Sequence, residues 1–336
     1  MTAGWNSAAA VPDVQRTATG RSVALAMPRA KKPADRSSMC IHTRIRVCLA
    51  KAIASGADRE PGAMQTASNP ERASSSTNVA AKAWVGCGSG METVTCLAGF
   101  SQRGDSWHEL TRLVPGGYHW LTPEIRAGTL PGAQAELLEL WEREGVQRSH
   151  LVGYSQGGRI ALWAACDHPR RLLSLTTIGA HAGFDDDERA RRRQEDLALA
   201  DRIEGQGIDW FASYWAALPI FAGLARRGPA FLAQLDAARR RNDPAQLAAQ
   251  LRAMGAGAVE PFWDRLDRIT TATLVMAGAD DQRYVAFAHR LCARIPHAEI
   301  ALVAGAGHAA HLERPAEVAS LLGAHLSRAG ADQGHH

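Results

Sequence analysis

A serine between small residues carries the clearest chemical signal in this chain of 336 residues. Residues 153–157 read GYSQG, with an apolar run before them and a helix-like run after them. In a strand, sharp turn and helix of this kind, the glycines leave room for a strained turn that presents the serine Oγ at the head of the helix. We therefore predict that Ser155 is a nucleophile or a base. The alternative is an ordinary Gly-Ser turn, because so short a pattern also recurs by chance.

Two later loops supply the partners that such a serine needs. The loop after the apolar run 274–278 carries Asp280 and Asp281, and the glycine-rich loop after the next apolar run ends in His308. A carboxylate in this order along the chain can orient an imidazole, which in turn polarises the serine. We predict a triad of Ser155, His308 and an aspartate of this loop. Asp281 is preferred as the acid, with Asp280 capping the loop or the helix that follows, and Asp280 as the acid is the alternative. A surface or core histidine is the alternative for His308.

From residue 91 onward, apolar strands alternate with amphipathic helices. The predicted strands are 94–98, 150–152, 172–178, 274–278 and 300–303, and the predicted helices are 133–146, 285–295 and one from residue 315. This alternation predicts an α/β fold with a mainly parallel sheet and flanking helices. In such a sheet the three triad loops follow the carboxyl ends of strands.

One long segment interrupts the alternation. Residues 185–263 are helical in pattern and rich in arginine, tryptophan and alanine, so we expect a helical cap inserted into the sheet domain. The core is then formed by residues 91–184 and 264–328, and residues 329–336 form a polar tail.

The first 90 residues differ in composition from the rest. They carry 12 Lys and Arg against 5 Asp and Glu, and they hold all four lysines of the chain. Their polar, low-complexity stretches predict a disordered basic extension. It could be a solvated extension without function, an organelle-targeting segment, or translated upstream sequence before a natural start at Met91; the absence of an amphipathic helix favours the first or third.

Cysteine use and charge narrow the class of protein. The six cysteines show neither C-x-x-C pairs nor a dense framework, so we expect reduced thiols, a cytoplasmic location and no metal site. No segment approaches the length of a membrane span, and residues 91–336 carry more acidic than basic residues. We therefore expect neither a membrane span nor a nucleic-acid partner; no oligomeric state follows from the sequence.

Over residues 94–327 the sequence resembles the 2-succinyl-6-hydroxy-2,4-cyclohexadiene-1-carboxylate synthases of menaquinone biosynthesis, a family of the α/β-hydrolase superfamily. The resemblance rests on the serine turn with an arginine four residues beyond it, on the stretches 189–194, 215–221, and 251–257 leading to 261–263, and on the acid loop 278–284. It implies an α/β-hydrolase fold without a cofactor. It also implies a lyase that eliminates pyruvate from a carboxylated small molecule, with Ser155 acting as a base.

The resemblance also implies the residues around the substrate. The oxyanion hole of this fold uses the backbone N–H after the nucleophile and one after the early strand, here Gln156 and Phe100. A guanidinium binds a carboxylate through two parallel hydrogen bonds, so the arginines at matching positions are expected to bind substrate. The substrate-binding residues implied are Tyr154, Arg159, Arg193, Trp215 and Arg283. For Arg191 and Arg192, substrate binding and a salt bridge or solvated helix face both stay open. The run 239–241 is expected on a solvated helix face.

The sequence departs from the family in places, and alternatives stay open. Ala98 stands where a histidine usually precedes the oxyanion glycine, residues 121–128 replace the usual turn, and little chain precedes the first strand after Met91. One alternative is a serine hydrolase, namely an esterase, a thioesterase or a carbon–carbon bond hydrolase that acts on a carboxylated small molecule. A non-catalytic binding module on the same fold is a further alternative.

Overall fold

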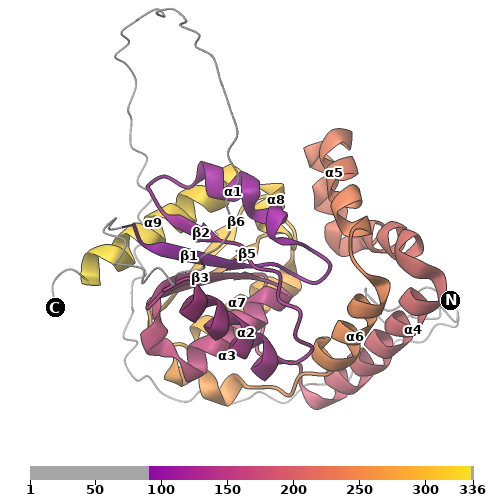
Figure 1. Cartoon of the computed structure of the whole chain (residues 1–336), viewed down its shortest axis with the longest axis horizontal. Helices are drawn as coiled ribbons and strands as arrows, with labels where there is room; N and C mark the ends of the chain where they lie inside the picture. The colour runs from indigo at the N-terminus through magenta and orange to yellow at the C-terminus, as the bar shows by residue number, and fades with distance from the viewer. Residues whose placement is uncertain (1–90, 334–336) are drawn as a thin grey trace, which may run out of the picture. The chain divides into compact units, whose positions relative to one another are not determined.

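A computed structural model describes residues 91–333 of the chain (Figure 1). The predicted basic extension of residues 1–90 and the last three residues lie outside the described part. Within it, a six-stranded sheet has the order β2-β1-β3-β4-β5-β6, and every neighbouring pair is parallel. The strands are β1 (Thr93–Leu97), β2 (His119–Leu121), β3 (Ser149–Tyr154), β4 (Leu172–Ile178), β5 (Thr273–Gly278) and β6 (Ala298–Val303).

The predicted parallel sheet is confirmed, because each predicted apolar run forms a strand. Strands β3, β4 and β5 are buried almost throughout, as parallel strands covered on both faces are. Strand β2 was not predicted from the sequence. It has three residues at the sheet edge, and His119 is exposed, so it shows no continuous apolar pattern.

Helices cover both faces of the sheet (Figure 1). One face packs against α2 (Leu130–Arg143), α3 (Gln156–Asp167) and α7 (Gln282–Cys292), and the other packs against α1 (His108–Leu113) and α9 (Pro315–Gln333). The neighbours Leu151 and Val152 on β3 belong to these two separate cores, as alternation along a strand requires. Helix α9 begins at a proline and continues to Gln333, so the expected tail from residue 329 is wrong up to that residue.

Shorter elements connect these layers. They are η1 (Gly104–Trp107), η2 (Pro169–Arg171), η4 (Trp263–Arg268) and α8 (Ala310–Glu313). Helix α8 follows the loop after β6 and leads directly into α9.

Between β4 and β5 the chain forms a helical segment, residues 185–263, which we call the insertion. It contains α4 (Asp186–Ala216), η3 (Pro219–Arg227), α5 (Pro229–Arg240) and α6 (Pro244–Met254). Non-helical torsion angles at Gly207 interrupt α4. The insertion has its own apolar core, in which Ile203 and Phe211 of α4 meet Ala248 of α6. Its helices lie to one side of the sheet in Figure 1.

In residues 91–333 no single helix is both long and apolar enough to cross a membrane. The pair α4 and η3, bent by 77°, passes the same test of length and composition when it is taken together. No group of three or more His, Cys, Asp or Glu side chains in these residues is arranged to hold a metal ion.

Two buried histidines lie on the helices that follow β6. His325 on α9 is 4% exposed, with Nε2 3.2 Å from the Leu175 carbonyl oxygen, and His311 on α8 is 1% exposed. Burial lowers the pKa of His325 to about 4 and the pKa of His311 to about 3. Both side chains are therefore neutral in the folded protein at pH 5, whereas the unfolded chain binds protons at these positions.

We expect the free energy of unfolding to decrease as the pH falls from about 6.5 towards 4, because the unfolded state then binds more protons. Each buried histidine contributes about 1.4 kcal/mol per pH unit to this slope. Replacing His325→Gln should flatten the slope by that amount, which urea denaturation at several pH values would measure. The exposed His289→Gln is the matched control and should leave the slope unchanged.

Candidate active site

The turn that carries Ser155 is strained, and the adjoining backbones approach very closely. Ser155 lies between β3 and α3 with φ 50° and ψ −108°, a conformation that is rare for a residue with a side chain. A Cβ on Gly157 would lie 2.1 Å from the Leu97 carbonyl oxygen, and one on Gly153 would lie 2.4 Å from the Gly157 carbonyl oxygen. Only glycine fits at these two positions. The predicted strand, turn and helix are all present, as β3, Ser155 and α3.

The three side chains predicted as a triad form one hydrogen-bonded chain. His308 Nε2 lies 3.1 Å from Ser155 Oγ, and His308 Nδ1 lies 3.2 Å from Asp281 Oδ2. A carboxylate accepts only, so Nδ1 carries the proton and Nε2 is free to accept the serine hydroxyl. His308 is 4% exposed and Asp281 is half-buried. This arrangement suits transfer of the serine proton to the imidazole.

The two neighbouring aspartates differ from the sequence prediction in one respect. Asp281 Oδ1 accepts a hydrogen bond from Tyr284 N at 3.2 Å and so caps α7, while Oδ2 faces His308. Asp280 does not cap the helix; its carboxylate is largely exposed and lies 3.7 Å from Arg226. The expectation that Asp280 would be the capping residue is therefore wrong, because Asp281 has both roles.

A cavity of about 690 Å³ opens beside Ser155 and His308. Of the residues predicted around the substrate, Phe100, Tyr154, Gln156, Arg159, Trp215 and Arg283 all line it. Arg193 does not. Its guanidinium donates to the carbonyl oxygen of Arg252, whereas the preceding Arg192 lines the cavity and pairs with Asp196 at 2.7 Å. The arginine that α4 presents to the cavity is thus one residue earlier than predicted.

Arg159 is a buried cation with unsatisfied hydrogen-bonding capacity. It is 6% exposed, its Nη2 donates to the Met254 carbonyl oxygen at 3.0 Å, and Nε has no partner in the described residues. Burial lowers its pKa. Its Nη1 lies 3.3 Å from His181 Nε2, but His181 Nδ1 accepts from Gly183 N–H, so the neutral ring has its proton on Nε2. Two donors therefore face each other, so the imidazole does not satisfy the Arg159 guanidinium.

Burial and the charge of Arg159 keep His181 neutral. Burial lowers the His181 pKa well below its usual value, and the neighbouring guanidinium lowers it further. The imidazole stacks on Phe184 and Phe287, with ring centroids 4.4 and 5.1 Å away. These rings fix the side chain in place next to Arg159.

Arg239 is a cavity residue that the sequence analysis placed on a solvated helix face. It is 6% exposed, lines the cavity, and no carboxylate lies within ion-pair distance of it in residues 91–333. Burial lowers its pKa. The sequence held one usable signal, because the apolar Leu235 lies one helical turn before Arg239 and so on the same face of α5. In the structure both residues line the cavity. The position of Arg239 in a run of three arginines obscured this signal.

Aromatic side chains enclose the histidine. The rings of Tyr284 and Tyr154 lie 4.2 and 5.3 Å from the His308 ring, and burial raises the pKa of both phenols. Trp215 of α4 packs against Phe100, with ring centroids 5.2 Å apart. The loop predicted to form the oxyanion hole is thus in contact with the insertion.

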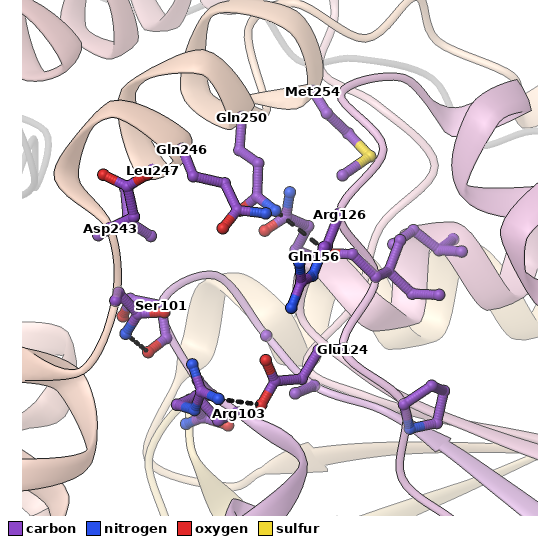
Figure 2. A pocket seen from close by; sticks show the side chains of 17 residues that line it. Ser101, Arg103, Glu124, Arg126, Gln156, Asp243, Gln246, Leu247, Gln250 and Met254 are labelled. Atoms are coloured by element: carbon purple, nitrogen blue, oxygen red, sulfur yellow. Dashed lines mark hydrogen bonds and ion pairs between the residues drawn. The ribbon is translucent and has the colours of Figure 1, made fainter.

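A second, smaller cavity of about 70 Å³ lies next to this loop (Figure 2). It shares Ser101, Gln102 and Gln156 with the large cavity, and the Arg103–Glu124 ion pair of 2.6 Å borders it. Figure 2 shows mostly polar side chains around an open centre. Ala98, in place of the usual histidine, is one of its walls. The volume is sufficient for a few water molecules.

The protein-family model described as the alpha/beta hydrolase family matches residues 96–321. The chain belongs to this family. Among relatives, a Klebsiella pneumoniae (strain 342) 2-succinyl-6-hydroxy-2,4-cyclohexadiene-1-carboxylate synthase is 31% identical over 245 residues, which cover 70% of this chain and 93% of that protein. A Bacillus subtilis (strain 168) protein given the same name provisionally is 29% identical over 236 residues, covering 67% and 86%. The chain therefore also belongs to this synthase family, as the resemblance indicated.

Solved structures of the alpha/beta hydrolase family agree on the fold. The structure of MenH from S. aureus matches with a TM-score of 0.67 at 24% sequence identity, over 71% of this chain and 94% of that one. The predicted α/β-hydrolase fold, with a parallel sheet and flanking helices, is confirmed.

Replacing Gly157→Ala should destabilise the protein by about 2 kcal/mol or more, because the new methyl group would overlap the Leu97 carbonyl oxygen. Denaturant unfolding would measure the loss. Gly205→Ala is the matched control: no atom lies within 4 Å of its Cβ position, and Gly205 lies in helix α4. That change should be neutral or stabilise by up to about 1 kcal/mol. Equal destabilisation of both variants would contradict the expectation.

Proposed function

We propose that this enzyme eliminates pyruvate from 2-succinyl-5-enolpyruvyl-6-hydroxy-3-cyclohexene-1-carboxylate, giving 2-succinyl-6-hydroxy-2,4-cyclohexadiene-1-carboxylate for menaquinone biosynthesis. One observation carries the proposal. Arg159, Arg192 and Arg239 line the cavity of Ser155 and His308, and no carboxylate of the described residues pairs with the first or the third. The naming of its relatives supports the same function.

The substrate suits this cavity electrostatically. It carries carboxylates on its succinyl, enolpyruvyl and ring groups, and each can accept two parallel hydrogen bonds from one guanidinium. Buried arginines without acidic partners gain most from such a ligand, because an unpaired buried charge is costly. The arginines thus hold the substrate, and the aromatic residues of the insertion cover its ring.

The hydrogen-bonded chain supplies the base. His308 Nε2 draws the proton from Ser155 Oγ, and the serine oxygen removes the proton from the ring carbon beside the succinyl ketone. The electron pair moves through the ring and breaks the carbon–oxygen bond to the enolpyruvyl group, which leaves as the enolate of pyruvate and takes up a proton. Asp281 holds His308 in the required tautomer. Proton transfer by such a base is worth about 10²- to 10⁴-fold in rate.

Negative charge develops on the ketone oxygen as the proton leaves. Backbone N–H groups of Phe100 and Gln156, both at the cavity wall, are placed by this proposal at that oxygen. Tyr154, Trp215 and Arg283 contact the substrate in the same proposal. Arg193 remains a prediction without support from its position.

Residues 185–263 act as the cap of the active site in this proposal, over a core of residues 91–184 and 264–328. The enzyme works on a small carboxylated molecule without a cofactor. A reducing, cytoplasmic location is supported by Cys96, Cys166 and Cys292, which are free thiols.

The experiment that tests the function is an assay of pyruvate release by the full chain with the pathway intermediate. Ser155→Ala should lower kcat by about 10²- to 10⁴-fold, because the base is removed. Release at the wild-type rate by Ser155→Ala would contradict the mechanism. No release by the folded wild-type chain would contradict the function.

Arg239→Ala should lower kcat/KM for the intermediate by about 10- to 100-fold, because a charge-assisted hydrogen bond to a carboxylate is lost. Steady-state kinetics would measure the change. Arg240→Ala is the matched control, since Arg240 pairs with Asp236 and Asp209 on the surface and does not line the cavity. A large loss in both variants would indicate general damage to α5 and not a lost substrate contact.

The hydrogen bond from Ser155 to His308 also suits a nucleophilic serine, so hydrolysis of a carboxylated ester or thioester is the second candidate. Ester turnover by the wild type without pyruvate release would support it. Labelling of Ser155 by a fluorophosphonate would not separate the two, because both need an activated serine.

A further inference from the structure

The loop that carries His308 is held at two points just before the histidine. Gly307 N–H donates to Glu313 Oε2 at 2.9 Å, and the Gly305 carbonyl oxygen accepts from Arg226 Nη2 at 2.8 Å. The chain turns at Gly305, where φ is 61°. The Gly305 carbonyl oxygen also accepts from Arg314 Nε at 3.2 Å. The position of His308 therefore depends on the Glu313 carboxylate and on two guanidinium groups, of which only that of Arg226 comes from the insertion.

Arg226 and Glu313 are also joined to each other. Arg226 of η3 lies 3.0 Å from Glu313 of α8, so this ion pair joins the insertion to the core. The Glu313 side chain is fully buried, and its Oε1 has no partner in the described residues. A buried carboxylate needs a paired cation, so Glu313 depends on Arg226.

The backbone of η3 touches the same carboxylate. A Cβ on Gly223 would fall 1.8 Å from Glu313 Oε2, so no side chain separates η3 from α8. Arg226 also lines the large cavity and lies 3.7 Å from Asp280, the neighbour of Asp281. A single arginine of the insertion thus reaches both loops that carry the partners of Ser155.

We propose that Arg226 and Glu313 are positioning residues that couple the seating of the insertion to the alignment of His308. With η3 seated, Arg226 holds Glu313 and Gly305, and the loop presents the imidazole to Ser155. With η3 displaced, Glu313 loses its cation and the loop loses an anchor, so the base is misaligned. His308 is therefore aligned with Ser155 only when the insertion covers the cavity. The inference rests on the proposed function only in the use of His308 as the base.

Two measurements separate this role from simple structural support. One is the split between kcat and KM in pyruvate release, and the other is rescue by Arg226→Lys, which keeps a cation beside Glu313.

The experiment measures how fast a small, uncharged fluorophosphonate labels Ser155 in the full chain at a fixed pH. Kinetics of pyruvate release are measured in parallel. The variants are Arg226→Ala, Arg226→Lys, Glu313→Gln and the double variant Arg226→Ala with Glu313→Gln. Arg241→Ala is the matched control, because Arg241 joins the insertion to Asp105 of η1 and not to the histidine loop.

We expect Arg226→Ala to slow labelling by about 10- to 100-fold, because a misplaced base is a poor catalyst. Glu313→Gln should also slow labelling, and the double variant should be no slower than Arg226→Ala, because both changes break the same ion pair. In pyruvate release kcat should fall with little change in KM. Arg226→Lys should recover part of the rate, and Arg241→Ala should match the wild type.

A wild-type labelling rate in Arg226→Ala would overturn the proposal, even if KM for the intermediate rises, since Arg226 would then only bind substrate. Equal slowing by Arg241→Ala would also overturn it, because any contact between insertion and core would then suffice. If Glu313→Gln does not fold, Arg226→Ala decides alone, since Arg226 is half-exposed. An absence of pyruvate release by the wild type counts against the proposed function and leaves the labelling comparison valid.

Discussion

The contact between helix α3 and the strands beneath it sets the geometry of the whole site. The backbone at Gly157 lies so close to the Leu97 carbonyl that a single methyl group cannot be inserted. This contact forces Ser155 into its strained turn at the end of β3. Because β3, β5 and β6 are parallel, the loops that follow them emerge at the same edge, so Asp281 and His308 lie within hydrogen-bonding reach of that turn.

Arginines in the cavity differ from arginines on the surface in their carboxylate partners. Surface arginines such as Arg240 and Arg252 have carboxylate partners, whereas the buried Arg159 and Arg239 have none in the described residues. A protein that buries a cation without a partner is less stable than one that pairs it. The ligand that restores balance is an anion with several carboxylates. In the proposed mechanism the core supplies the triad and Arg159 of α3, and the insertion supplies Arg192 of α4 and Arg239 of α5.

The sequence predicted most of the sheet and the triad, because strand alternation and the order serine, acid, histidine are local patterns read one element at a time. It predicted Arg159 and Arg283, which line the cavity, but it did not predict Arg192 or Arg239 there. Arg192 differs from Arg193, and Arg239 from Arg240, only by 100° around a helix, and the face that points inward depends on packing between α4, α5 and a core distant in sequence. The roles of Asp280 and Asp281 depend likewise on side-chain direction, which spacing alone does not give.

The double role of Asp281 separates it from the other polar residues of the site. Functional residues commonly reduce stability, so their replacement often yields a more stable but inactive protein. Arg159 and Arg239 fit that description, because apolar side chains would remove a buried, unpaired charge. Asp281 does not, since it also caps α7, and its removal lowers stability and activity together. In a random library selected for heat resistance alone, position 281 would therefore keep a capping residue such as Asp, Asn or Ser, while positions 159 and 239 would be free to change.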